Sequence, residues 1–214
     1  MNTNANSLSP LPRLLALEPA TGQARRRHVG RARLDSVALD NFNDLLRRLG
    51  WSGAPLQHDQ IASAARELVD ARHPGTPDCI VQRMHRAEVL ARMATDTAWE
   101  IPDQARPALE AVLAYTHRHD GLIPGWVPQV GHLDEAIVID TALPQLAREL
   151  DSYAGFCRVR QAEAWLRGCA EEAVPLRRAE WEAARDTPGM RRRQREQVIA
   201  SSYAPPPAVL FRVH

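Results

Sequence analysis

Apolar residues recur along most of the chain at the three-to-four-residue spacing of amphipathic α-helices. This spacing predicts helices over about residues 36–49, 59–72, 76–93, 103–118, 133–149, 152–168 and 175–202. Glycine and proline interrupt the pattern between them, as at Gly50 and at Pro74-Gly75. No segment shows a persuasive strand pattern. The sequence therefore predicts an all-α fold, a single-domain bundle of about seven helices joined in one place by a loop rich in proline and glycine.

The two ends of the chain differ from this helical body. Residues 1–34 begin with Asn, Ser and Pro and continue into arginines with few apolar side chains, which is typical of a flexible arm. Three consecutive prolines begin at Pro205, and Val209, Leu210 and Phe211 follow them. We predict a flexible arm over 1–34, a helical domain over 35–203 and an extended tail over 204–214.

Composition and charge narrow the class of protein. The formal net charge is +1 and all basic side chains are arginine, so no global field attracts nucleic acid. No apolar run approaches the roughly eighteen residues that a membrane-spanning helix needs. Three cysteines without metal-type spacing are expected to be reduced thiols. These features favour a cytoplasmic protein without a transmembrane helix or signal peptide.

Residues 119–140 combine helix-breaking residues with acids and histidines. Pro124 and Pro128 fix φ near about −65°, and three glycines permit tight turns. We expect a rigid helix-to-helix connection that fills a gap between helices with Leu122, Ile123, Trp126 and Val127. Asp134 is then expected to cap the next helix or to lie in its first turn.

This segment resembles the signature of the YkvA-like bacterial domain, a family of unknown biochemical function. The residues that match are Leu122, Ile123, Pro124, Trp126, Val127, Pro128, Gly131, Leu133, Asp134 and Ile137 to Ile139. The resemblance covers about residues 105–145. The chain departs from the family pattern at Gly121 and Gly125, where the family has Asp, and at His132, where it has an aromatic residue. The resemblance implies no catalytic residue.

The same segment also carries residues of the types that bind metal ions. His117, His119, His132, Asp134 and Glu135 come from two helix ends and the loop between them. If they converge, they could hold a divalent metal and support hydrolysis. No tight metal motif occurs, so the alternative is that these side chains are solvated. No other cofactor is expected.

Asp140 lies within the apolar arc of its predicted helix. A carboxylate in such a place needs a charged partner or must be neutral. The candidate partners are Arg106, Arg118 or an arginine of residues 158–167. We expect a structural ion pair, with a catalytic acid as the alternative.

A basic cluster near the N-terminus contains Arg25, Arg26, Arg27, Arg31 and Arg33. It could neutralise phosphates of a nucleic acid or of an anionic membrane surface. It has no interleaved aromatic residues for base stacking, and most clusters of this kind are solvated.

Together these patterns favour a non-enzymatic protein-interaction or adaptor protein, with a protein partner or self-association through exposed apolar tail residues. A metal-dependent hydrolase using residues 117–135 and a polyanion binder using Arg25 to Arg33 are the alternatives.

Overall fold

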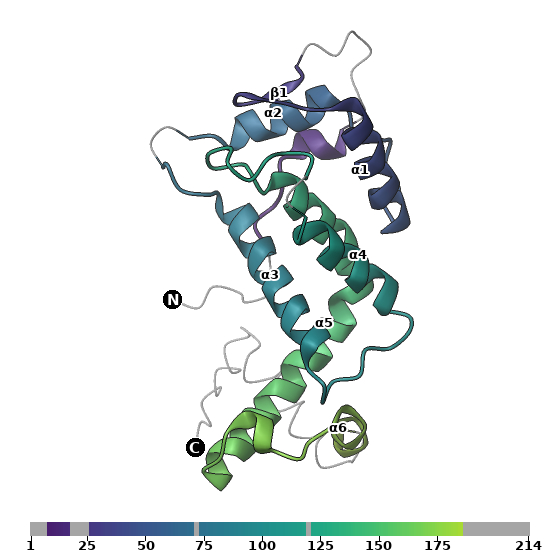
Figure 1. Cartoon of the computed structure of the whole chain (residues 1–214), viewed down its shortest axis with the longest axis vertical. Helices are drawn as coiled ribbons and strands as arrows, with labels where there is room; N and C mark the ends of the chain where they lie inside the picture. The colour runs from purple at the N-terminus through teal and green to yellow at the C-terminus, as the bar shows by residue number, and fades with distance from the viewer. Residues whose placement is uncertain (1–7, 18–25, 71–72, 119–120, 186–214) are drawn as a thin grey trace, which may run out of the picture. The chain divides into compact units, whose positions relative to one another are not determined.

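A computed structural model describes residues 8–17, 26–70, 73–118 and 121–185, and the predicted all-α class is confirmed for them (Figure 1). These residues form six α-helices, two short 3-10 helices and one small β-hairpin. Their contacts divide them into two compact units, one ending at Ala154 and the other beginning at Gly155. The prediction of a single domain stays a prediction.

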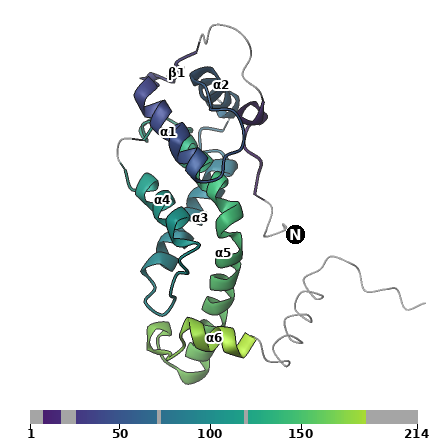
Figure 2. The same ribbon diagram turned by 90° about the vertical axis from the view of Figure 1, so that its right-hand side faces the viewer.

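The first unit is built from four complete helices and the beginning of a fifth. They are α1 (Ser36–Arg48), α2 (His58–Leu68), α3 (Asp78–Thr95), α4 (Arg106–Thr116) and the first part of α5 (Leu133–Arg167). α3, α4 and this part of α5 run side by side (Figures 1 and 2). Their facing side chains form the core, which includes Ile80, Leu90, Leu133, Ile137, Ile139 and Leu146.

Two helix starts show how local sequence fixes the boundaries. α1 is capped by Asp35, whose Oδ1 accepts a hydrogen bond from the backbone N–H of Ala38 at 2.9 Å. α2 begins with a capping box in which the side chains of Gln57 and Gln60 each accept a bond from the other's backbone N–H. Both caps satisfy backbone donors that the first helical turn leaves unpaired.

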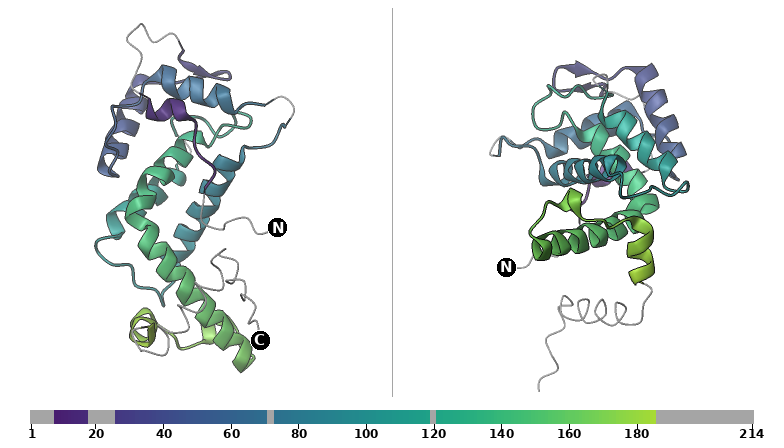
Figure 3. Two further views of the ribbon diagram at one scale, coloured as in Figure 1. Left: turned by 180° about the vertical axis from the view of Figure 1, so that it is seen from behind. Right: turned by 60° about the horizontal axis from the view of Figure 1, so that its bottom comes forward.

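A short hairpin precedes α1, in a region where no strand was expected. β1 (His28–Val29) pairs antiparallel with β2 (Ala32–Arg33), and the hairpin packs on α2. Val29, Ala32 and Leu34 are buried there, so this part of the predicted arm is folded. The 3-10 helix η1 (Arg13–Ala16) also packs on α2, as the view from behind shows (Figure 3).

α5 continues through Pro144 as one helix of 35 residues, whereas the sequence predicted two helices with a break near residue 150. A proline removes one helical N–H···O bond, but burial of neighbouring side chains can offset that loss. Ala142 and Leu146, on either side of Pro144, are both fully buried. This merger explains why the described residues contain six α-helices. None of those helices is both long and apolar enough to cross a membrane.

The second unit contains the end of α5, the 3-10 helix η2 (Glu171–Ala173) and α6 (Arg178–Arg185), seen in Figure 2. Phe156, Val174 and Trp181 are its larger buried apolar side chains. The guanidinium of Arg185 lies 5.3 Å from the ring centre of Trp181, a cation–π distance. α6 occupies part of the predicted region 175–202, and the predicted tail 204–214 lies outside the described residues.

The expected ion pair at Asp140 is present, but the predicted partners are wrong. Its Oδ1 accepts bonds from Nε and Nη2 of Arg83 on α3, with a distance of 2.8 Å to Nε. Nη1 of Arg83 donates to the carbonyls of Ser9 and Cys79, each at 2.8 Å. Arg83 is 3% exposed. The side chain of Asp140 is 42% exposed, so the carboxylate lies at the edge of the core.

We expect Asp140→Asn to lower the free energy of unfolding by about 2 kcal/mol. The amide oxygen can still accept from Arg83, but the negative charge that compensates the buried guanidinium is lost. Urea denaturation would measure this change. Asp44→Asn is the matched control, since Asp44 and Arg47 form an exposed pair at 2.9 Å whose loss should cost no more than about 0.5 kcal/mol. Equal effects of the two variants would contradict the buried role of Arg83.

Candidate functional site

A fully buried carboxylate, that of Asp134 in the first turn of α5, joins three parts of the first unit. Its Oδ2 accepts hydrogen bonds from the Tyr115 hydroxyl at 2.7 Å and from the backbone N–H of Ile123 at 3.1 Å. The Tyr115 oxygen in turn accepts a bond from the backbone N–H of Leu122 at 3.2 Å. Asp134 therefore ties α4 and the 121–131 loop to α5. It lies in the first turn of α5, which is one of the two positions expected for it.

The surroundings of Asp134 shift its protonation. Burial raises its pKa to about 6, although the hydrogen bonds from Tyr115 and Ile123 oppose the shift. Burial and the nearby Asp134 charge also raise the pKa of Tyr115 far above its ordinary value. Tyr115 therefore remains a protonated donor at physiological pH. Oδ1 of Asp134 accepts no hydrogen bond from any residue that the structure describes.

The 121–131 loop has the predicted packed form, except at its tryptophan. Leu122, Ile123 and Val127 are buried, whereas Trp126 is 64% exposed and does not fill the gap between helices. A Cβ added at Gly131 would lie 2.6 Å from the carbonyl oxygen of Gly125, so this approach requires glycine.

Gly121 has a similar restriction. A Cβ there would lie 2.9 Å from Oδ2 of Asp134. A second carboxylate at this position, as in the YkvA-like pattern, would crowd a buried acid that already has two donors. The glycine is therefore compatible with the Asp134 network.

The predicted metal ligands do not converge among the described residues. Nδ1 of His132 lies 2.8 Å from Oε2 of Glu135, while Nδ1 of His117 lies 2.7 Å from the Leu113 carbonyl oxygen. Asp134 is bound to Tyr115, and His119 lies outside the described residues. In the described part of the chain, no group of three or more His, Cys, Asp or Glu side chains could hold a metal ion.

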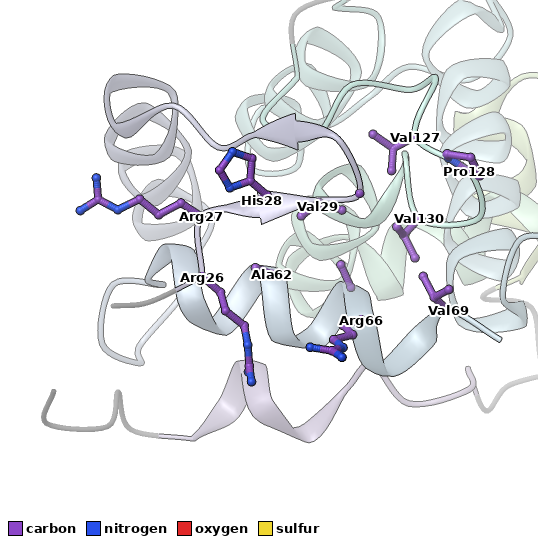
Figure 4. Close-up of a pocket in the computed structure, with 12 residues that line it drawn as sticks. Arg26, Arg27, His28, Val29, Ala62, Arg66, Val69, Val127, Pro128 and Val130 are labelled. Carbon is purple, nitrogen blue, oxygen red and sulfur yellow. The ribbon is translucent and has the colours of Figure 1, made fainter. Parts of the chain in front are cut away.

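A cavity of about 570 Å³, here called the hairpin slot, lies between the hairpin, α2 and the 127–130 segment. Its lining combines buried apolar residues with basic ones, namely Arg26, Arg27, His28, Val29, Gly30, Ala62, Ala65, Arg66, Val69, Val127, Pro128 and Val130. In Figure 4, Val69, Val127 and Val130 gather at one end, and Arg27 lies at the other end and points away from them.

The hairpin slot contains part of the predicted basic cluster. Arg26 donates from Nη1 to the Ser63 hydroxyl at 2.8 Å and from its backbone N–H to Asp59 at 3.2 Å. Arg31 and Arg33 are exposed on the hairpin and do not line the slot. Arg25 lies outside the described residues.

A second cavity of about 970 Å³, here called the α1–α4 groove, has a different character. Its apolar floor includes Ala38, Phe42, Leu45, Ala111, Ala114 and Leu122. Both signs of charge line it, with Asp35 and Asp44 among the acids and Arg47, Arg48 and Arg118 among the bases.

Sequence reasoning missed two residues that organise this unit, Tyr115 and Arg83. Tyr115 follows Ala108 by seven positions and Val112 by three, so the helical spacing places it on the buried stripe. Arg83 follows Ile80 by three and precedes Ala87 by four, which also places it on an inward stripe. A polar residue at such a position was the available signal for a buried hydrogen-bond network.

No protein-family model matches the chain, and no curated protein or solved structure matches it either. The resemblance to the YkvA-like domain stays a prediction.

The raised pKa of Asp134 predicts how stability depends on pH. Between about pH 4 and about pH 6 the folded state retains a proton that the unfolded state has released. The free energy of unfolding therefore falls as pH rises through this window, by at most about 3 kcal/mol for two pKa units. Urea denaturation at a series of pH values would measure the decline.

Asp134→Asn provides the comparison, because its amide oxygen can still accept from Tyr115 and Ile123 but does not ionise. The difference in stability between wild type and Asp134→Asn should change across the window. Parallel profiles for the two proteins would show that Asp134 titrates normally.

Proposed function

We propose that the protein is a non-enzymatic interaction protein that self-associates through the α1–α4 groove. The observation that carries this proposal is the α1–α4 groove, which has an apolar floor. Beside this floor α1 exposes an apolar side chain, and the two ends of α1 carry opposite charges. The occupant we propose is α1 of a second copy of the chain.

The apolar part of this surface suits helix packing. Val37 lines the groove and is 67% exposed, although it belongs to the same helix whose Phe42 and Leu45 form the floor. Two copies related by a two-fold axis would each place this ridge of α1 in the other's groove. An isologous contact of this kind uses one surface patch twice and closes the assembly at a dimer. Burial of apolar area would then stabilise it.

The charges of α1 support an antiparallel pairing. Asp35 stands before the first turn, while Arg47 and Arg48 lie in the last turn. In an antiparallel pair, the acidic start of each α1 lies near the basic end of the other. The helix dipoles are then also opposed. Such complementarity specifies orientation more than it adds affinity.

The two alternatives have weaker support. The described candidates for a metal-dependent hydrolase separate into a His132–Glu135 pair, a backbone-bonded His117 and a buried Asp134. The basic cluster is divided between the hairpin slot and the exposed hairpin. Self-association through Val209 to Phe211 concerns residues outside the described ranges. A cytoplasmic location is part of the proposal, and it accords with Cys79 and Cys169, which are free thiols.

We expect Val37→Arg to convert a concentration-dependent dimer into a monomer, because it places a charge on the apolar ridge. Sedimentation velocity over a range of concentrations would measure the change. Val81→Arg is the matched control, since Val81 is a 48% exposed valine on α3 that does not line the groove. Circular dichroism would establish that both variants fold. A wild-type chain that stays monomeric at every concentration would overturn the proposal, even if a different protein binds.

The charge pattern has its own test. Arg48→Glu places an acid near Asp35 of the second copy and should weaken dimerisation about tenfold or more, as like charges are brought together. Arg92→Glu, in the last turn of α3, is the control for a reversed charge at a helix end. If both variants dimerise as the wild type does, the antiparallel α1 contact is wrong.

A further inference from the structure

We propose that the hairpin slot binds a small amphipathic carboxylate, a medium-chain aliphatic acid whose chain lies along the valines and whose carboxylate lies at the arginine end. This site is separate from the dimer contact, because the two cavities have no lining residue in common.

The size and lining of the slot suit a small organic molecule. Its volume of about 570 Å³ falls within the range of roughly 300–1,000 Å³ that is usual for ligand pockets. Five of its lining residues belong to the buried core of the unit, namely Val29, Ala62, Ala65, Val127 and Val130. These side chains offer an apolar wall without a hydrogen-bonding group, which matches an alkyl chain.

The basic residues are concentrated where the hairpin begins. Arg26, Arg27 and His28 are consecutive, and the lining set contains no acid to neutralise them. Arg26 is bonded to Ser63 and Asp59, so this end of the slot lies beside the first turns of α2. The pKa of His58, the first residue of α2, is lowered by burial and by the positive charge of Arg27. The slot thus has three consecutive basic residues near the start of α2. Its valines gather near Val69, where Arg66 in the last turn of α2 is the one basic lining residue.

This polarity selects the ligand class. A carboxylate can accept charge-assisted hydrogen bonds from guanidinium groups, while an alkyl chain gains from leaving water. A nucleic acid would use stacking aromatics, and none occurs among the lining residues. A membrane surface would meet exposed basic and apolar side chains, whereas five of the seven apolar side chains that line the slot are buried, and only Val69 and Pro128 are exposed.

Isothermal titration calorimetry with decanoate, below its micelle concentration, tests the proposal on the full-length protein. Decanoate should bind at one site per chain. Butyrate has the carboxylate without the long chain, and decanol has the chain without the charge, so each should bind at least about tenfold more weakly. Failure of decanoate to bind, or equal binding of decanoate and decanol, would overturn the proposal.

Substitutions of slot residues test whether decanoate binds in this slot. Arg27→Gln should weaken decanoate binding by up to about tenfold and leave decanol binding unchanged, as one charged partner is removed. Val69→Ser, at the apolar end, should weaken both ligands. Arg92→Gln on α3 is the matched arginine control and should bind decanoate like the wild type. Unaltered decanoate binding in both slot variants would place the ligand elsewhere and overturn the proposal.

A vesicle sedimentation experiment distinguishes binding to a membrane surface from binding of a free carboxylate. Vesicles of phosphatidylglycerol should not sediment the protein more than neutral phosphatidylcholine vesicles do. Binding to the anionic vesicles without binding of free decanoate would show that the basic end recognises a lipid surface, and would overturn the slot as a carboxylate site.

Discussion

The hydrogen bonds of the Asp134 carboxyl hold together the part of the first unit on which both cavities depend. The carboxyl binds Tyr115 of α4 and the backbone at Ile123, and so fixes where the 121–131 loop leaves one helix and enters another. Leu122 lies on one side of this attachment and lines the α1–α4 groove. Val127 and Val130 lie further along the loop and line the hairpin slot. A single buried acid therefore positions walls of two separate cavities.

Other buried polar groups have a comparable structural role in this unit. The Arg83 guanidinium joins α3 to α5 and also binds the carbonyl of Ser9, which positions the N-terminal segment. The indole N–H of Trp99 donates to the buried carboxylate of Glu149 at 2.8 Å. Groups of this kind contribute little net stability but are costly to leave unpaired, so they favour one arrangement of the helices over others.

The helical class and most helix positions were predictable because their signals are local. The apolar spacing and the breaks at Gly50 and Pro74-Gly75 placed α1, α2 and α3 within a few residues of their observed bounds. The continuity of α5 through Pro144 was not predictable in this way, since it depends on burial against other helices. The hairpin was missed because its two strands are only two residues long each, too short for an alternating pattern.

The sites were less predictable than the fold, because they depend on contacts between distant residues. Asp140 was correctly expected to need an arginine, but its partner is 57 positions away in the sequence. The acids and histidines of residues 117–135 are adjacent in sequence, yet Asp134 points into the core while His132 and Glu135 pair at the surface. The predicted burial of the Trp126 side chain was wrong, because loop geometry, not residue type, decides which side chain faces the core.

The 121–131 loop contributes lining residues to both cavities, and this has a thermodynamic consequence. If a molecule in the slot displaces Val127, the displacement can pass along the loop to Leu122, which lies five residues away and next to Ile123, the residue that the Asp134 carboxyl binds. If the displacement reaches Leu122, the occupancy of one cavity changes the affinity of the other. Linkage requires this coupling to be reciprocal, so a ligand that strengthens association of two chains is itself bound more tightly by the associated form. The loop would in that case couple the binding of a small molecule to dimerisation of the protein.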